Sequence, residues 1–385
     1  MIAKRTTKNG DVRYDVRLRG PDGQERSKTF RTKKEAERYE RAHFAALDAG
    51  TWVDPRAGRI TLEEWATEWR RTIVHLRPKT VSAYDSNLRN HILPALGHHE
   101  LARLRPPVLR AWLAELCTKR TRGDGVLAPL SVLQAYRTLN RVLTAAVDDE
   151  LLARNPMTRI EPPRVETKPM RFLTHAEVAR LAESIDQRYG PLVLLAAYGG
   201  LRAGELFALR WENLDLDHLC IRVVEQVQHV SGHLLVSAPK TDAGRRQVPI
   251  PAFVAAELAA RRTDKDRDES ARLVFAAPGG GYLRDSNFRR RTWAPAVERA
   301  GLAPLRLHDL RHTCASLAIA AGADIKVLQR MLGHSSAALT LDRYGHLMPG
   351  QAEAVAARLD QLARDARSTA SAEETDGDGH ESGAS

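Results

Sequence analysis

The chain has 385 residues, 43% hydrophobic and 28% charged, with a formal net charge of +11 and a pI near 9.8. This length is too great for one ordinary hydrophobic core, so two or three domains are expected. The excess of basic residues favours a polyanionic partner, nucleic acid first. Charge alone is equally compatible with a solvated basic surface. Cysteine spacing argues against a disulfide framework and a zinc site, and the lack of an apolar N-terminal segment or a bilayer-length apolar stretch predicts a cytosolic protein.

The first fifty residues predict a small sheet followed by a helix. Val12, Tyr14, Val16 and Leu18 are spaced by two with charged residues between them, which is strand periodicity. The "GPDG" that follows is turn chemistry, and the basic stretch TKKEAERYERAHFAAL predicts a helix. "AGTWVDPRAGR" then predicts a linker.

Residues 61–155 predict an all-helical bundle. Thr61 is a plausible N-cap, and Glu64 three residues later completes a capping box. Apolar positions then recur at spacings of three and four through several segments. Residues 156–171 are rich in proline and charge, which predicts an interdomain linker.

A second helical domain is expected from "LTHAEVARLAESI" onward. It contains three short β-branched runs separated by turns, "CIRVVEQV", "HLLVSAP" and "RRQVPI", before helices resume. After about residue 365 the sequence becomes small, polar and acidic, which predicts disorder. The fold class expected for the whole chain is mainly α with small β elements (α+β).

The segment "HDLRHT" is the first candidate for chemistry in this domain. His308 and Arg311 lie three apart on a predicted helix, so they share a face about one turn apart. A guanidinium is a permanent, planar donor set that suits a phosphate. Taken alone, the pair is about equally compatible with a solvated helix surface.

Arg202 and Lys240 lie in two further short motifs. "GGLRAGEL" puts Arg202 in the first turn of a helix, where free N–H groups also favour anions, and makes Glu205 an orienting or capping partner. "PKTDAGRR" puts Lys240 in the turn between two apparent strands, as a hairpin tip that could project a cation into a groove. Each is weak alone, since a structural arginine and a solvated lysine are the commoner outcomes.

The last two motifs are "MLGHSS" and "LDRYGH". Asp324 can cap a helix that Gly333 ends, which places His334 at a chain reversal and not on a core face. A histidine there is more often a capping or surface group, and Tyr344 taken alone is more often a packing residue. Together, however, the five motifs supply a nucleophile, anion-binding groups and an acid. That set indicates phosphoryl transfer without a metal or a nucleotide.

The ordered pattern Arg…Lys…His-x-x-Arg…Gly-His…Tyr resembles the tyrosine recombinase (phage integrase) family over nearly the whole chain. The resemblance implies that Tyr344 attacks a DNA phosphodiester and forms a 3′-phosphotyrosine link, releasing a 5′-hydroxyl. It implies that Arg202 and Arg311 hold the non-bridging oxygens, that His308 and His334 add hydrogen bonds or assist proton transfer, and that Lys240 protonates the leaving oxygen. His312 and His346 are expected to pack or to bond locally.

The resemblance also implies a domain layout. We expect an arm-type DNA-binding module at 1–55, a helical SAM-like core-binding domain at 60–156, a linker at 157–171, a catalytic domain at 172–365 and a disordered acidic tail at 366–385.

The implied partners are double-stranded attachment-site DNA and three further copies of the chain in a homotetramer, with a host architectural protein and an excision factor. No cofactor, metal or membrane is expected, and the location would be cytoplasmic, with the bacterial nucleoid. Residues 350–365 predict an amphipathic helix that packs either on a neighbouring copy or on its own domain. "FRRRTW" (288–293) is a candidate phosphate contact, whereas 261–268 is of mixed sign.

Two other functions stay open on sequence alone. A type IB topoisomerase uses similar chemistry, but the additional helical and basic N-terminal modules favour recombination. A DNA-binding regulator with an inactive catalytic domain would not need the complete set of six residues.

Overall fold

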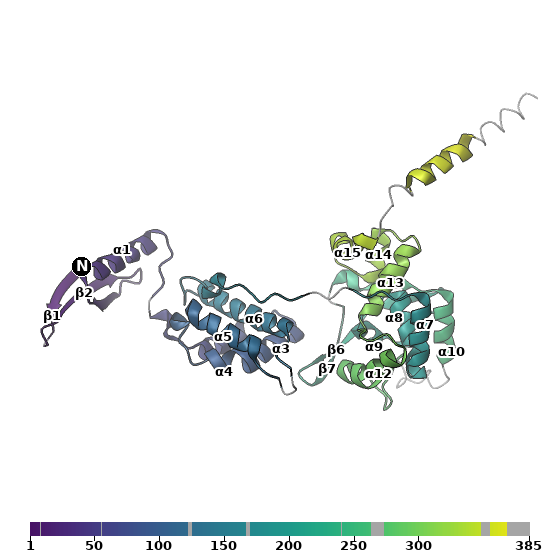
Figure 1. The fold of residues 1–385 in the computed structure, drawn as a ribbon, viewed down its shortest axis with the longest axis horizontal. Helices are drawn as coiled ribbons and strands as arrows, with labels where there is room; N and C mark the ends of the chain where they lie inside the picture. The colour runs from purple at the N-terminus through teal and green to yellow at the C-terminus, as the bar shows by residue number, and fades with distance from the viewer. Residues whose placement is uncertain are drawn as a thin grey trace, which may run out of the picture. The chain divides into compact units, whose positions relative to one another are not determined.

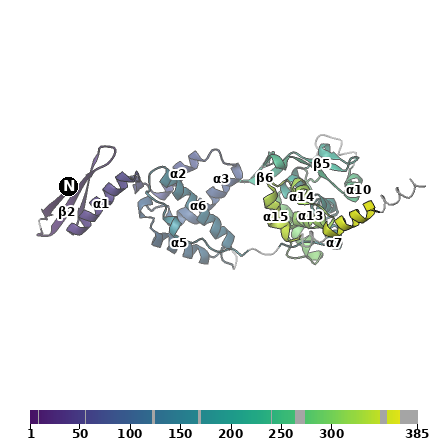
Figure 2. The same ribbon diagram turned by 90° about the horizontal axis from the view of Figure 1, so that it is seen from above.

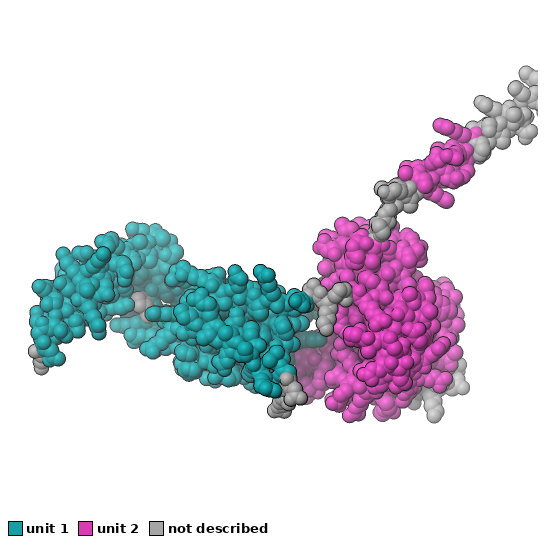
Figure 3. Space-filling view, in the orientation of Figure 1, with its two compact units in different colours: residues 1–168 teal, residues 169–385 magenta. Residues whose placement is uncertain are grey.

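The computed structural model describes residues 1–7, 9–54, 56–121, 125–166, 170–239, 241–262, 273–347 and 355–367. The chain forms two compact units, Met1–Lys168 and Pro169–Ser385, drawn in different colours in Figure 3. The fold is mainly helical with small antiparallel sheets, as the sequence predicts. No helix in the described part of the chain is both long and apolar enough to cross a membrane.

The first unit begins with a three-stranded antiparallel sheet covered by one helix (Figure 1). The elements are β1 (Ile2–Thr6), β2 (Val12–Arg19), β3 (Glu25–Phe30) and α1 (Lys33–Asp48), with β2 in the centre. Val16 and Leu18 of β2 are buried against Ala36 of α1, so the alternating pattern identified the core face. β1 was not predicted, because its sequence IAKRT lacks such a pattern and is ordered by pairing with β2.

The helical part of the first unit packs around one apolar core. Its elements are η1 (Ala57–Arg59), α2 (Leu62–Thr72), α3 (Pro78–Asn87), the π-helix η2 (Leu88–Ile92), α4 (Leu93–Leu96), η3 (Leu101–Arg103), α5 (Pro106–Thr118), α6 (Pro129–Asp148) and η4 (Pro156–Arg159). The predicted capping box of Thr61 and Glu64 starts α2. Met157 and Ile160 are buried in this core, so the connecting segment starts later than the predicted residue 157.

Pro94 explains the π-helical turn between α3 and α4. A proline has no N–H to donate to the carbonyl four residues earlier, which is that of Asn90. Lys119 Nζ donates to the Asn90 carbonyl at 2.9 Å instead. The interruption is therefore local, and α3, η2 and α4 follow one another without a loop.

The second unit contains most of the helices and both of the remaining small sheets. Its elements are α7 (His175–Ser184), η5 (Gln187–Tyr189), α8 (Gly190–Gly199), α9 (Ala203–Ala208), η6 (Trp211–Asn213), β4 (Leu214–Asp215), β5 (Cys220–Val223), β6 (Gln226–Val230), β7 (His233–Ser237), η7 (Asp242–Gly244), β8 (Arg246–Pro249), α10 (Ala252–Arg261), α11 (Asp285–Phe288), η10 (Arg289–Trp293), α12 (Ala294–Arg299), α13 (Asp309–Ala320), α14 (Ile325–Leu332), α15 (Ala337–Tyr344) and η11 (Gly345–Leu347). A further helix covers 355–367.

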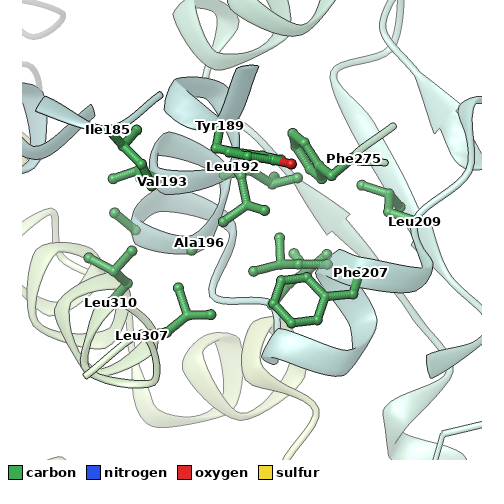
Figure 4. Packing of buried hydrophobic residues seen from close by; sticks show 14 of the residues in the cluster. Ile185, Tyr189, Leu192, Val193, Ala196, Phe207, Leu209, Phe275, Leu307 and Leu310 are labelled. Carbon is green, nitrogen blue, oxygen red and sulfur yellow. The ribbon is translucent and has the colours of Figure 1, made fainter. Parts of the chain in front are cut away.

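The buried helix α8 forms the centre of the second unit. Tyr189, Leu192 and Ala196 pack there with Phe207 and Leu310, as Figure 4 shows. α13 lies along α8, and α14 and α15 follow beside α13 (Figures 1 and 2). Hydrogen bonds join the predicted motifs in this arrangement, since Arg202 and Arg311 contact the end of α14 and His312 of α13 contacts Tyr344 of α15.

The sheet region differs from the predicted hairpin around Lys240. β7 pairs with β6, whereas β8 pairs with β5 in a separate sheet, so the two strands flanking Lys240 are not partners. Lys240 itself lies outside the described residues. The prediction of a hairpin tip was wrong because the two short runs looked adjacent in sequence but belong to different sheets.

The C-terminal helix was predicted at 350–365 and is observed at 355–367, so residues 366 and 367 are helical. The rest of the predicted tail, 368–385, lies outside the described residues. Val355, Leu359 and Leu362 are spaced by four and three and are exposed. The helix therefore carries an apolar stripe that the second unit does not cover.

Candidate active site

Three arginine side chains converge on the C-terminal end of α14. Arg246 Nε donates to Met331 O at 2.8 Å, Arg311 Nη2 donates to Leu332 O, and Arg202 Nη2 donates to Gly333 O at 3.1 Å. The last carbonyls of a helix lack helical partners and carry the negative end of its dipole, so cations stabilise them. Three positive charges from distant parts of the sequence are thereby held within one turn of α14.

Glu205 is the carboxylate that these cations share. It accepts the backbone N–H of Arg202 at 2.9 Å, pairs with Arg202 Nη1 at 2.8 Å and pairs with Arg246 Nη2 at 3.0 Å. Burial alone would raise the pKa of Glu205, but the charges of Arg246 and Arg202 outweigh burial and lower it. The predicted orienting role of Glu205 is confirmed, and Arg202 lies at the N-cap of α9 instead of inside its first turn.

Arg311 is buried, with only 3% of its surface exposed. Its Nη1 donates to the carbonyl of Gly200 at 2.6 Å, the residue that ends α8 in a left-handed conformation. Desolvation, followed by the charge of Arg202, lowers the pKa of Arg311. The alternative of a solvated surface is therefore excluded for Arg311, and a nearby anion would offset the cost of burying its charge.

His308 is the N-cap residue of α13 and is exposed, in contrast to Arg311 one turn later. Its ring packs edge-on against His312, with centroids 4.9 Å apart. Desolvation and the neighbouring His312 and Arg311 lower the pKa of His308 to about 4. His308 is therefore a neutral, accessible hydrogen-bonding group at neutral pH.

Tyr344 ends α15 and is fully buried. Its ring packs with Ala315, Leu328 and Leu332 in a small apolar cluster. Desolvation raises the pKa of the phenol, and the charges of Arg311 and Arg343 act in the opposite direction. The side chain is thus a packed aromatic that also lies within electrostatic reach of Arg311.

His334 is buried beside Tyr344, with the two rings nearly parallel and their centroids 6.3 Å apart. Its Nδ1 lies 2.9 Å from the hydroxyl of Thr340. Desolvation, followed by the charges of Arg311 and Arg202, lowers the pKa of His334 to about 3. The prediction that His334 lies off the core was wrong, because α15 packs back over the end of α14.

His312 and Arg246 are two site residues that sequence reasoning did not select. His312 Nδ1 lies 2.7 Å from the Tyr344 hydroxyl, so its hydrogen bond spans 32 residues and is not local as predicted. Arg246 lies two residues before buried Val248 and four before buried Ile250, so the alternation of the strand places it on the core-facing side. An arginine on the core-facing side of a predicted strand was the available signal for a buried ionic partner.

The remaining candidates lie outside this cluster. His346 is exposed, with its ring centroid 6.4 Å from that of Phe172, and Arg343 is exposed. In "FRRRTW", Arg290 and Arg291 are exposed while Phe288 and Trp293 are buried, an arrangement compatible with phosphate contacts. Of the mixed-sign stretch 261–268, residues 263–268 lie outside the described residues.

The cluster combines a phenol, neutral imidazoles and arginine cations. Five of the six predicted residues lie in it, and the sixth, Lys240, is not described. Within the described ranges, no group of three or more His, Cys, Asp or Glu side chains could hold a metal. This composition suits nucleophilic attack on a phosphodiester with electrostatic stabilisation by arginine.

Comparison with known proteins gives consistent matches. Residues 171–350 match the phage integrase family, and residues 61–117 match the N-terminal SAM-like domain of phage integrases. The integrase of Mycobacterium phage D29 is 30% identical over 348 residues, which cover 87% of this chain and 90% of that protein.

Two solved structures share the fold. The integrase of transposon Tn1549 in complex with circular intermediate DNA has a TM-score of 0.66 at 20% identity, over 78% of this chain and 99% of that one. A lambda integrase tetramer bound to a Holliday junction has a TM-score of 0.53 at 19% identity, over 86% and 95%.

Proposed function

This chain belongs to the phage integrase family of tyrosine recombinases and is a site-specific enzyme that breaks and rejoins DNA, and on that premise we propose that Tyr344 is its nucleophile. The phenolic oxygen attacks the phosphorus of a DNA phosphodiester, forms a 3′-phosphotyrosine link and releases a 5′-hydroxyl. The observation that carries this proposal is the position of Tyr344 in one buried cluster with Leu332, whose carbonyl accepts a hydrogen bond from the buried cation Arg311. Burial raises the pKa of the phenol, and the charge of Arg311 opposes that rise. A tyrosine with an ordinary pKa of about 10 is otherwise a weak nucleophile at neutral pH.

Arg202 and Arg311 hold the non-bridging oxygens of the phosphate in this proposal. Their guanidinium groups are oriented before DNA arrives, because carbonyls of Gly200, Leu332 and Gly333 accept hydrogen bonds from them. Removing one preorganised donor from such a site costs about 3–4 kcal/mol of barrier. His308, which is exposed, and His334, beside the Tyr344 ring, supply further hydrogen bonds.

Lys240 protonates the leaving 5′-oxygen. Support comes from the described residues that follow it, because a Cβ on Gly333 would lie 2.7 Å from Ala243 O, so this segment passes the end of α14. A 5′-alkoxide is a poor leaving group and needs a positioned acid. The phosphotyrosine link conserves the energy of the broken bond, so a second 5′-hydroxyl can reverse the step without ATP.

The rest of the chain serves DNA binding and assembly. We assign residues 1–55 to an arm-type DNA-binding module, 60–156 to the core-binding domain and 172–365 to the catalytic domain. Four copies act together on two attachment-site duplexes, with a host architectural protein and an excision factor selecting the direction. Lambda integrase, which shares the fold, has been solved as a tetramer on a Holliday junction.

The C-terminal helix links neighbouring copies in this assembly. Its exposed stripe of Val355, Leu359 and Leu362 matches in character an apolar groove on the second unit, which Tyr198, Phe253, Leu317 and Val327 help to line. We propose that the helix of one copy occupies this groove on the next copy.

Covalent trapping tests the proposed nucleophile. The full chain is incubated with DNA of its source element and denatured, and DNA that stays attached is sequenced to identify the site. A nicked duplex of that site should then give a stable adduct with the native chain and none with Tyr344→Phe. An adduct of undiminished yield with the phenylalanine variant would sink the assignment.

A further inference from the structure

The Tyr344 hydroxyl has one hydrogen-bonding side chain among the described residues, the imidazole of His312. The Nδ1 to Oη distance is 2.7 Å, and both residues are buried. A general base must lie within about 2.6–3.2 Å of the atom whose proton it removes. His312 meets this geometric requirement before any DNA is bound.

We propose that His312 is the group that accepts the proton of Tyr344 when the phenol attacks DNA, an inference that rests on the proposed role of Tyr344 as nucleophile. The O–H bond of Tyr344 breaks and its proton moves to Nδ1, while the oxygen forms a bond to phosphorus and the bond to the 5′-oxygen breaks. The departing oxygen takes its proton from a separate acid. In rejoining, His312 returns the proton to the tyrosine oxygen as a second 5′-hydroxyl displaces it.

The ionisation state of His312 suits an acceptor. Desolvation and the charge of Arg343 lower its pKa to about 4, so the ring is neutral at pH 7, and the tautomer with its proton on Nε2 leaves Nδ1 free to accept. The charged and titratable groups around it are Arg306, His308, Asp309, Arg311, Arg343 and Tyr344. A phosphodiester is anionic, so its arrival stabilises the protonated imidazole and strengthens the base when substrate is present.

The other candidate bases are already occupied or face elsewhere. His334 lies parallel to the Tyr344 ring, and its Nδ1 is 2.9 Å from the Thr340 hydroxyl. Glu205 is held by Arg202 and Arg246, and Asp309 by Arg306. His308 contacts His312 by ring packing and has no hydrogen bond to Tyr344 in the described structure.

Tyr344 has no exposed surface, so a phosphate reaches its oxygen only after the side chains over it or α15 shift. The same hydrogen bond could therefore act as a latch that keeps the nucleophile buried. The two roles predict opposite effects of removing the imidazole: loss of a base slows cleavage, whereas loss of a latch accelerates it. A single-turnover rate decides between them.

The test measures adduct formation on the nicked duplex identified by trapping. His312→Ala and His312→Asn should both be slower by about 10²- to 10⁴-fold, the usual contribution of a general base. Asn retains an acceptor near the position of Nδ1 but cannot take a proton, so a native rate for Asn would reduce His312 to a positioning residue. His346→Ala, an exposed histidine two residues from Tyr344, is the control and should react at the native rate.

The pH profile separates proton transfer from damage to the fold. In His312→Asn the rate should rise about tenfold per pH unit between pH 6 and 9, because only the phenolate fraction reacts, whereas the native profile is much flatter. A more acidic fluorinated tyrosine at position 344 should speed up the variant far more than the native chain. Equal slopes, a native rate or a faster rate would each overturn the proposal.

Failure of the inference is distinguishable from failure of the proposed function. If Tyr344→Phe abolishes the adduct while His312→Asn cleaves normally, Tyr344 remains the nucleophile and only the base is wrong. If Tyr344→Phe still forms the adduct, the proposed function itself fails. Melting temperature and attachment-site binding of each variant verify that it is folded.

Discussion

Arg246 and Glu205 form an ion pair of 3.0 Å in which the two side chains are only 6% and 1% exposed. The pair joins the start of β8 to α9, and Arg246 also donates a hydrogen bond to the Met331 carbonyl at the end of α14. The carboxylate therefore balances the charge of Arg246 and of Arg202, which we propose holds the phosphate. Burying such a cluster without its counter-ion would leave uncompensated charge.

Glu205→Ala should lower the free energy of unfolding by about 3–5 kcal/mol, the cost of breaking a buried pair. The free energy of unfolding is measured by denaturant titration of the full chain, with a spectroscopic probe placed in the second unit. Glu212→Ala removes an exposed carboxylate seven residues further along and should change stability by about 0.5 kcal/mol or less. Equal losses for the two variants would contradict the role given to Glu205.

Gly200→Ala tests the packing between α8, α13 and α14. Gly200 has a φ of 65°, and a Cβ there would lie 2.8 Å from Leu332 Cδ2 and 3.0 Å from Cys314 Sγ. Gly301 has a φ of 66° but nothing within 4 Å of a Cβ. Gly301→Ala should therefore cost only the left-handed backbone, about 1–2 kcal/mol, while Gly200→Ala adds about 1–3 kcal/mol of overpacking. Indistinguishable melting temperatures would refute the tight contact.

Stability should fall on acidification because two buried histidines resist protonation. The pKa values of His312 and His334 are lowered to about 4 and about 3, whereas an unfolded histidine titrates near 6.5. Between those values the unfolded chain binds more protons, so stability is complete above pH 6.5 and decreases as the pH falls. Each histidine contributes about 1.4 kcal/mol per pH unit near pH 5. His334→Asn should reduce this slope, and the exposed His346→Asn is the matched control.

The C-terminal helix should matter for assembly and not for folding. Leu359→Glu with Leu362→Glu places charges on its exposed apolar stripe and should reduce multimer formation on attachment-site DNA, measured by mass photometry. Arg364→Glu changes charge on the opposite face of the same helix and should reduce it less. An unchanged yield of multimers in the double variant would indicate that the helix packs on its own domain and does not link neighbouring copies.

The sequence predicted what depends on local pattern. Thr61 with Glu64, and Asp324 with Gly333, marked helix ends correctly because caps depend on neighbouring residues. The partnership of His312 with Tyr344 and the capping of α14 by three arginines could not be predicted. Both features join residues that are far apart in the sequence. They depend on how α13, α14 and α15 pack together, and hydrophobic periodicity does not specify that packing. β1 was missed for the same reason, since pairing with β2 orders it.

Lys240→Ala tests the proposed leaving-group acid, whose chemistry is independent of the proton taken from Tyr344. Cleavage of an ordinary phosphodiester should slow by about 10²- to 10⁴-fold, because the 5′-oxygen then departs without a proton. Replacing that bridging oxygen with sulfur gives a better leaving group that needs no acid, so the variant should recover most of its rate on the sulfur substrate. His312→Asn should not recover, because its defect lies on the attacking oxygen. Recovery by His312→Asn but not by Lys240→Ala would exchange the two assignments, and recovery by neither would remove Lys240 as the acid.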